Sequence, residues 1–488
     1  MESVVKTEYG QVRGERAGGI AAFRGIPYAA PPFGPHRLQP PARPLAWDGV
    51  RDALAYGPTA PKPPLPRPFD ELLPEPAIPG DDCLNLNVWT PDPGRAGLPV
   101  MVWVHGGSFV NGSGALPRYA GDRFARDGVV CVTINYRLGC DGFLFLEDVT
   151  PNRGLLDQIA ALEWVQDNIA AFGGDAGNVT IFGESAGGMS VTTLLAMSRA
   201  AGLFRRAIPQ SGAGHHVLSP GTARLVTAEL ADRLGVAATR EGFVGVSVDR
   251  LVAAQRRLSD DIVASPDPGR WREATVIEMA FAPVVDGELL SARPIDAVAG
   301  GAGADVDLLV GTNTDEHRLF LVPTGAMDST TDATLAAVAG ALGLDATGLA
   351  AYTDVDSPGE ALAAVLTDCF FWLPAIRLAE AHRGASYLYE FAWKSPMYEG
   401  RLGACHGLEI PFVFDTLDAE GFERVLGPVA PGALAAAMHK AWVDFATTGD
   451  PGWPAYDLQA RPTMIFDVDS AVITDPRGRR RTVWDNIR

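Results

Sequence analysis

Residues 178–188 read NVTIFGESAGG, and this stretch predicts a buried strand, a sharp turn and the start of a helix. Val179 to Phe182 is a β-branched and aromatic run of strand length. The next five residues follow the pattern G-x-S-x-G, with Ser185 at the centre. Residues 189–197 are mostly apolar and compatible with a short helix.

A tight strand-to-helix turn of this kind suits a nucleophilic serine. The side chain stands clear of its own backbone, and glycine is needed two residues to either side because the turn crowds the chain there. The serine also lies at a helix N-terminus, where backbone N–H groups face a developing anion. The chain contains 54 glycines, so a plain turn is the alternative, but the flanking strand and helix patterns favour a nucleophile.

Length and composition indicate a globular protein. A chain of 488 residues that is 47% hydrophobic can bury a large core, and we expect one domain spanning residues 1–488. The net charge of −19 argues against nucleic acid or an anionic membrane as a partner. No run approaches the roughly 18 apolar residues that a membrane span needs, so none is expected. The sequence gives no basis for an oligomeric state.

The cysteines suggest neither a metal site nor a disulfide framework. There are five, widely spaced and without a C-x-x-C motif, so we expect no metal and no cofactor. The N-terminus lacks the apolar core of a signal peptide, so a cytoplasmic location is the default expectation. Only four of the 40 basic residues are lysine, a bias that indicates a GC-rich bacterial genome.

Hydrophobic patterning along the chain predicts an α/β fold with a large, mostly parallel central sheet flanked by helices. Apolar residues at helical spacing predict a helix over 155–172. Residues 221–280 and 331–383 have helical patterns and look like excursions from the sheet, whereas the proline-rich residues 57–80 predict a long irregular loop. The predicted strands cover residues 83–89, 100–104, 129–134, 179–182, 306–311 and 386–393.

In an open parallel sheet, reactive groups lie beyond the carboxyl ends of the strands. Ser185 follows one predicted strand, and Asp315 and Glu316 follow another, so either carboxylate is a candidate partner for a histidine. In the order serine, acid, histidine, the histidine comes last. His406, in a flexible loop, is favoured only slightly over His317 on these grounds.

A third strand end, at residues 105–108, contains two adjacent glycines. Gly106 and Gly107 let backbone amides approach a ligand closely, as an oxyanion loop requires, with a further donor from Ala186. The alternative is a simple glycine turn. His215 and His216 follow the strand after Ser185, where they could line a pocket.

Several motifs together resemble the type-B carboxylesterases, a family of α/β-hydrolases that includes bacterial para-nitrobenzyl esterases and the cholinesterases. The resemblance runs from about residue 4 to about residue 466. The segments that carry it are residues 23–29, 81–88, 135–139, 172–187, 210–212 and 442–451.

The resemblance implies a serine hydrolase that cleaves small carboxylic esters through an acyl-enzyme, in a cleft covered by helical excursions. It implies Ser185 as nucleophile, Glu316 rather than Asp315 as the acid, and His406 as the base. The remaining implied site residues are the oxyanion donors Gly107, Ser108 and Ala186 and the supporting residues Glu184, Ser211 and Gly106.

The resemblance also implies two buried ion pairs, Arg24 with Asp81 and Arg137 with Asp157. One departure stands out, because relatives usually have glycine where this chain has His317. Two alternative functions are compatible with the same fold. One is acyl transfer to an alcohol acceptor, and the other is a catalytically silent binding protein, which the presence of all three triad residues disfavours.

Overall fold

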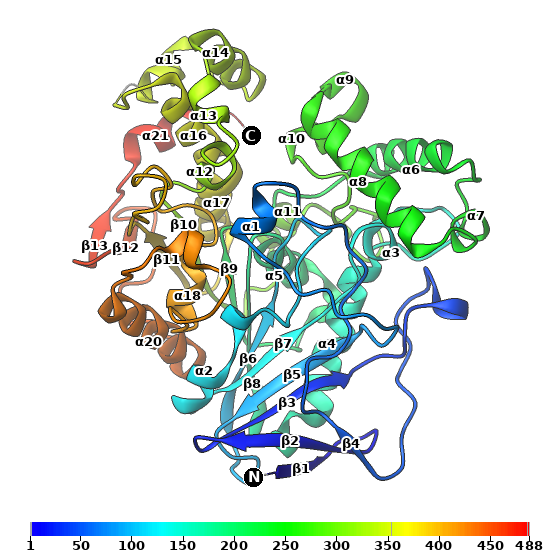
Figure 1. Cartoon of the computed structure of the whole chain (residues 1–488). Coiled ribbons are helices and arrows are strands. Elements are labelled where there is room, and N and C mark those ends of the chain that lie inside the picture. Colours follow the sequence, from blue (N-terminus) through cyan, green and yellow to red (C-terminus); the bar gives the residue numbers. More distant parts are fainter. Residues whose placement is uncertain (1, 353, 486, 488) are drawn as a thin grey trace.

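The computed structural model describes residues 2–352, 354–485 and 487. Its centre is a 13-stranded sheet that draws on the whole chain, from the first described residues to the C-terminal strands (Figure 1). The strand order is β1-β2-β3-β5-β7-β6-β8-β9-β10-β11-β12-β13, and β4 pairs with β2 at one edge.

The middle of the sheet is parallel, as the sequence predicts. Most of its strands contain a run of apolar residues that is buried on both faces, the environment in which parallel strands occur. In sheet order they are β7 (Val130–Ile134), β6 (Leu98–Val104), β8 (Gly174–Glu184), β9 (Arg206–Gln210), β10 (Asp307–Asn313), β11 (Ser386–Phe391) and β12 (Pro462–Phe466).

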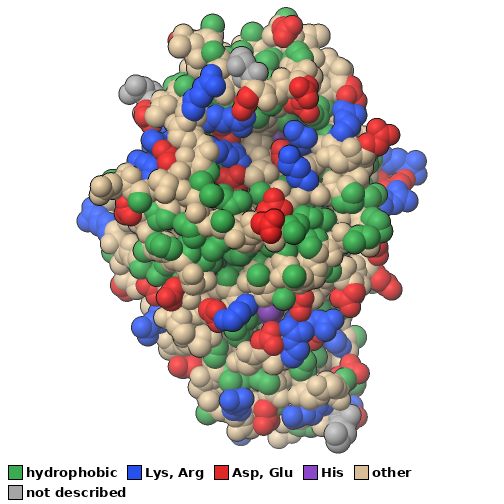
Figure 2. All heavy atoms as spheres, turned by 90° about the vertical axis from the view of Figure 1, so that its left-hand side faces the viewer, with side chains coloured by type: hydrophobic (Ala, Val, Ile, Leu, Met, Phe, Trp, Pro, Cys, Tyr) green, Lys and Arg blue, Asp and Glu red, His purple; other side chains and the backbone are tan. Residues whose placement is uncertain are grey.

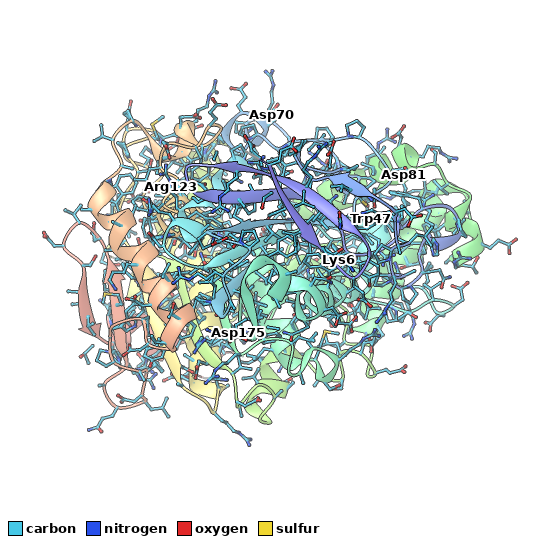
Figure 3. The ribbon with its side chains drawn as sticks, turned by 90° about the horizontal axis from the view of Figure 1, so that it is seen from below. Lys6, Trp47, Asp70, Asp81, Arg123 and Asp175 are labelled. Atoms are coloured by element: carbon cyan, nitrogen blue, oxygen red, sulfur yellow. The ribbon has the colours of Figure 1, made fainter. Side chains whose placement is uncertain are left out.

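Toward both edges the strands pair antiparallel, except that β4 pairs parallel to β2, so the complete sheet is mixed. Figure 3 views the molecule from below and shows the N-terminal strands crossing that end, beside Lys6 and Trp47. The opposite edge strand, β13, lies on the face turned to the viewer in Figure 2, where hydrophobic side chains gather in a band across the middle. The strands outside the parallel centre are β1 (Glu2–Lys6), β2 (Gln11–Ala17), β3 (Ile20–Pro27), β4 (Val50–Asp52), β5 (Asn85–Thr90) and β13 (Ala471–Thr474).

Two apolar cores lie on opposite faces of the sheet. Strand β6 contributes to both, because successive side chains of a strand point to opposite faces. Val102 lies in one core and Trp103 in the other. The first core is covered by α4 (Arg153–Asn168), α5 (Ala186–Ala196) and α17 (Leu373–Ala381), and the second by α2 (Asp122–Arg126), α18 (Ile410–Val413) and α20 (Gly432–Thr448).

The predicted excursions form two helical groups above the upper end of the sheet in Figure 1. One group comprises α6 (Pro220–Leu234), α7 (Arg240–Val244), α8 (Val248–Ala264), α9 (Pro268–Trp271) and α10 (Glu273–Val276). The other comprises α12 (Arg318–Leu321), α13 (Ala326–Ser329), α14 (Asp332–Ala341), α15 (Ala346–Leu349) and α16 (Pro358–Thr367). The remaining helices are α1 (Phe69–Leu72), α3 (Gly139–Phe143), α11 (Pro294–Ala299), α19 (Glu423–Leu426) and α21 (Gly478–Val483).

One helical stretch, Pro358–Ala381, is apolar enough to resemble a membrane span by length and composition alone. It runs from α16 through a π-helical turn at Asp368–Trp372 into α17. Within the described residues it is the only single helix of this kind, and 83% of its most apolar window is buried inside the protein. It therefore packs as a core helix of this fold.

Of the two expected ion pairs, one is confirmed and the other is wrong. Arg137 and Asp157 are buried and 2.7 Å apart. Arg24 instead lies 3.5 Å from Glu15. Asp81 is exposed on the exterior of the molecule (Figure 3) and does not contact Arg24. The strand that contains Arg24 turns its guanidinium toward the neighbouring edge strand, out of reach of the loop at residue 81.

The C-terminal segment folds back on the sheet through Arg477, which precedes α21. Its guanidinium pairs with Asp368 at 2.8 Å and with Glu390 at 2.6 Å. It also donates a hydrogen bond of 3.3 Å to the carbonyl of Thr314. One buried cation thus connects the π-helical turn, strand β11 and the end of strand β10.

Candidate active site

Ser185 occupies the sharp turn between β8 and α5, as the sequence predicts. Its backbone angles, φ 58° and ψ −124°, lie in a strained region that non-glycine residues rarely adopt. A side chain at Gly187 would place its Cβ only 2.0 Å from the carbonyl oxygen of Val104, so glycine is required there. Within residues 181–190 only Ser185 is partly exposed, and all the others are buried.

The acid loop and the histidine loop meet at the same edge of the sheet. Nδ1 of His406 donates a hydrogen bond of 2.6 Å to Oε2 of Glu316. The other oxygen of Glu316 accepts a hydrogen bond of 2.8 Å from the backbone N–H of Asn313, which fixes the carboxylate from the opposite side. The side chain of Asn313 also donates to the carbonyl of Cys405 at 2.7 Å. Glu316 is fully buried, so this arrangement is held away from water.

Asp315, the alternative acid, turns away from His406. Its carboxylate accepts a hydrogen bond from the N–H of Ala404 at 3.0 Å and pairs with Arg318 at 3.1 Å. The N–H of Asp315 in turn donates to the carbonyl of Ala404 at 3.0 Å. Of the two neighbouring carboxylates, one therefore contacts the imidazole, and the other ties the acid loop to the histidine loop.

His406 lies between two carboxylates. Its Nε2 atom is 3.0 Å from Oε1 of Glu184, the residue before Ser185. Burial would lower the pKa of His406, but the negative charges of Glu184 and Glu316 outweigh burial and raise that pKa well above its usual value. Among the described contacts there is no hydrogen bond between Nε2 and the Ser185 hydroxyl; such contacts often tighten only when substrate binds.

The loop at residues 105–112, hereafter the 105–112 loop, runs beside the serine turn. A Cβ at Gly106 would lie 3.1 Å from the Cβ of Ser185. Gly107, Ser108 and Phe109 adopt positive φ angles of 116°, 53° and 60°, which curl the chain tightly. The amide of Ala186 begins helix α5, where the first N–H groups have no partner within the helix.

His317 has surroundings unlike those of His406. Its ring packs against Phe320, Phe370 and Phe371 at centroid distances of 5.1–5.5 Å. Burial among these rings, together with the positive charge of His406, lowers the pKa of His317 to about 3. His317 is therefore a neutral imidazole at physiological pH, and the geometry favours His406 as the histidine that pairs with an acid.

The sequence model described as the carboxylesterase family matches residues 1–475. The chain belongs to the carboxylesterase family. Characterised relatives include the para-nitrobenzyl esterase of Bacillus subtilis, which is 39% identical over 503 residues covering 98% of this chain and 97% of the relative. The phenmedipham hydrolase of Pseudarthrobacter oxydans is 36% identical, with 96% of each chain covered. This carboxylesterase is accordingly an enzyme, a carboxylic ester hydrolase.

Solved structures agree with the fold of this carboxylesterase. The Geobacillus stearothermophilus carboxylesterase Est55 superposes with a TM-score of 0.86 at 37% identity, with 99% of each chain covered. A para-nitrobenzyl esterase structure gives the same TM-score at 36% identity, again over 99% of each chain. These relatives have the α/β-hydrolase fold, so the fold class expected from the sequence is confirmed.

The site of this carboxylesterase contains a third carboxylate that the sequence analysis missed. Glu409 is fully buried and accepts hydrogen bonds from Asn313 at 2.7 Å and from Gln210 at 3.1 Å. Burial, and then the negative charges of Glu184 and Glu316, raise its pKa to about 8, so it is mainly protonated at neutral pH. The available signal was a lone acidic residue in the apolar run 408–414.

The other expected site residues of this carboxylesterase lie around the same sheet edge. Ser211 is fully buried directly after β9, and its N–H donates to the carbonyl of Gly311 at 2.9 Å. His216 is buried, with its ring centroid 6.1 Å from that of Phe370, and burial lowers the pKa of His216 to about 4. Within the described residues, no group of three or more His, Cys, Asp or Glu side chains is arranged to hold a metal ion.

A cavity of about 160 Å³ opens beside Ser108. Its walls come from the proline-rich loop, the 105–112 loop, helix α8 and the segment after α10. Glu278 lines this cavity with a positive φ of 56°. Arg256 and Asp260, which also line it, are paired with each other at 2.7 Å.

Proposed function

We propose that this carboxylesterase cleaves esters through an acyl-enzyme formed on Ser185, with His406 as general base and Glu316 as its orienting acid. The observation that carries the proposal is the 2.6 Å contact between His406 and the buried Glu316, at the sheet edge where Ser185 stands on its strained turn. The amides of Gly107, Ser108 and Ala186 are the proposed oxyanion donors.

The reaction divides into two similar halves. Ser185 Oγ attacks the carbonyl carbon while its proton moves to Nε2 of His406, and the three amides stabilise the oxyanion. The tetrahedral intermediate collapses as His406 gives that proton to the leaving alcohol. Water then attacks the acyl-enzyme and its proton moves to His406. The second tetrahedral intermediate collapses as His406 gives that proton to Ser185 Oγ, which releases the acid and regenerates Ser185.

Glu316 and Glu184 have different proposed roles. Glu316 holds the imidazole in the tautomer with a proton on Nδ1, which leaves Nε2 free to accept the serine proton. Glu184 lies on the Nε2 side, so its negative charge stabilises the imidazolium that forms during attack. Ser211 and Gly106 support the serine turn by close packing, and one half of the ester occupies the cavity beside Ser108.

The test is the variant Ser185→Ala with a chromogenic short-chain ester such as p-nitrophenyl butyrate. We expect both the burst of product and the steady-state rate to disappear, and labelling by a fluorophosphonate probe to be lost with them. Wild-type activity or labelling in the variant would refute the nucleophile assignment. Labelling of the wild-type enzyme would also exclude the silent binding protein.

Acyl transfer to an alcohol is the remaining alternative, and product analysis with added alcohol distinguishes it from hydrolysis.

We further propose that residues 1–488 fold as one domain, because a single sheet draws on strands from both ends of the chain. A cytoplasmic location is supported by the four buried cysteines Cys83, Cys131, Cys140 and Cys405, whose thiols form no disulfide.

A further inference from the structure

A buried ion pair in the proline-rich loop (residues 57–80) contacts the 105–112 loop directly. Lys62 and Glu75 lie 3.0 Å apart, and their side chains are only 6% and 12% exposed. Nζ of Lys62 donates a hydrogen bond of 2.9 Å to the carbonyl of Gly112, and the N–H of Gly112 donates one of 3.0 Å to Oε2 of Glu75. Both backbone polar groups of one glycine are thus bound by a cation and an anion of the other loop.

Gly112 has no freedom to move independently of the start of its loop. With φ at +98°, a Cβ there would lie 2.1 Å from the carbonyl oxygen of Gly106, so the two backbones are in close contact. The neighbouring Asn111 donates its backbone N–H to the carbonyl of Gly107 at 2.8 Å. Its side chain donates to the carbonyl of Pro63 at 2.8 Å, which is a third tie between the loops.

We infer that Lys62 and Glu75 are positioning residues that hold the amides of Gly107 and Ser108 in place. The inference rests on the proposed function, in which those amides stabilise the oxyanion. The ion pair is oriented, with its cation on the carbonyl and its anion on the N–H of Gly112, so it fixes the two peptide groups on either side of that glycine. Through the contacts with Gly106 and Gly107, this fixed backbone sets the curl of the loop.

The proline-rich loop is suited to carry such a tether. Its prolines restrict the backbone, so the two charged side chains start from a stiffened chain. Burial lowers the pKa of Lys62, while the charge of Glu75 counteracts that effect. Removing Glu75 would leave an uncompensated buried cation, which strongly destabilises the folded state. The loop also supplies Pro63 and Pro66 to the cavity beside Ser108, so the same tether fixes one wall of that cavity.

The experiment compares the tether with a control pair of matched burial. The tether variants are Lys62→Met, Glu75→Gln and the charge-reversed double variant Lys62→Glu/Glu75→Lys. The control is Arg37→Met/Asp141→Asn, because Arg37 and Asp141 form an ion pair whose side chains are 7% and 12% exposed and which bears no proposed catalytic role. The readouts are kcat and KM for p-nitrophenyl butyrate, affinity for a trifluoromethyl ketone, Tm, and hydrogen exchange of peptides covering residues 104–114.

We expect Lys62→Met and Glu75→Gln to lower kcat by about 10- to 100-fold, because misplacing a catalytic group by about 1 Å can cost about 100-fold. KM stays within about twofold, affinity for the trifluoromethyl ketone falls in parallel with kcat, and exchange across 104–114 accelerates. The control variant Arg37→Met/Asp141→Asn should lower Tm without changing kcat, affinity for the trifluoromethyl ketone or hydrogen exchange across 104–114. Charge reversal does not restore kcat, because each charge then faces the wrong backbone group of Gly112.

Two outcomes would overturn the inference. One is a loss of Tm like that of the control, with kcat and hydrogen exchange unchanged, since the pair would then be merely structural. The other is recovery of kcat in the charge-reversed variant, which would refute the orientation argument. Hydrogen exchange does not depend on turnover, so it tests the tether even if Ser185→Ala retains activity and the proposed function fails.

Discussion

Two buried histidines near the same sheet edge differ sharply in their surroundings. His406 is between Glu184 and Glu316, and its pKa is raised well above the usual value. His317 is enclosed by three phenylalanine rings, and its pKa is lowered to about 3. The comparison teaches that burial alone does not make a histidine a proton acceptor. The charge of its neighbours decides whether it takes up a proton at neutral pH.

The sharpest way to break the comparison is to remove each imidazole in turn. We expect His406→Ala to lower kcat/KM by about 10⁴-fold or more, the size of loss seen for other triad histidines. His317→Phe keeps the aromatic packing and should change kcat/KM by less than about tenfold, because surface and packing changes rarely reach the scale of a lost base. Hydrolysis of p-nitrophenyl butyrate measures both, and similar losses for the two variants would contradict the assignment.

The next test separates the two neighbouring carboxylates of the acid loop. Glu316→Gln should reduce kcat by about 10³- to 10⁴-fold, because an amide no longer holds the imidazole in the required tautomer. Asp315→Asn should have a much smaller effect on kcat and should mainly lower Tm, since Asp315 contacts Ala404 and Arg318 rather than His406. Steady-state kinetics and thermal unfolding of both variants decide the matter, and a larger kinetic loss in Asp315→Asn would reverse the assignment.

A third test changes the charge on the Nε2 side of His406. Glu184→Gln removes a negative charge 3.0 Å from the ring, so the pKa of His406 falls. The neutral, reactive imidazole then persists to lower pH, and the acid limb of the kcat/KM profile should move down by about one unit or more. The Ser211→Ala variant serves as a control that leaves charge unchanged. An acid limb that stays in place or moves up would show that Glu184 does not set this pKa.

The smallest effect is expected at Glu409. Its pKa of about 8 in the folded protein lies above the usual carboxyl value of 4.5, so the folded state favours the protonated form. Its contribution to stability is present at low pH and is lost as pH rises toward and through 8. Glu409→Gln mimics the protonated form, so kcat at pH 7 should change by less than about threefold.

Thermal unfolding measures the prediction for Glu409. The Tm of the wild-type enzyme should fall more between pH 5 and pH 9 than that of Glu409→Gln. Equal pH dependence in the two proteins would mean that Glu409 is ionised in the folded state.

The sequence predicted the parallel centre of the sheet, because long β-branched runs bounded by turns are informative by themselves. It also predicted the contact between Glu316 and His406, which depended on the order of residues along the chain and on the family resemblance. It named Glu184 as a supporting residue but did not predict its contact with Nε2 of His406, and it missed Glu409. Glu184 comes from the serine turn and Glu409 from the segment after the histidine loop, and no local pattern reveals where such distant residues lie in space.

The wrong ion pair has a similar cause. Arg24 lies on a strand next to a charged edge strand, so an exposed partner, Glu15, was available at short range. The short edge strands β1 and β4 were also not identified, because a pattern of three to five residues does not distinguish a strand from a loop. Contacts between neighbouring strands determine both the partner of Arg24 and the formation of these short strands.

Arg477 gives the end of the chain a structural role that lies outside the family-model match. That match stops at residue 475, so a protein trimmed to it would lack this arginine. Such a truncation would leave Asp368 and Glu390 facing each other without their cation, close beneath the segment that presents Glu316. For anyone preparing this enzyme for crystallisation or immobilisation, the safe course is to extend the C-terminus and never to shorten it.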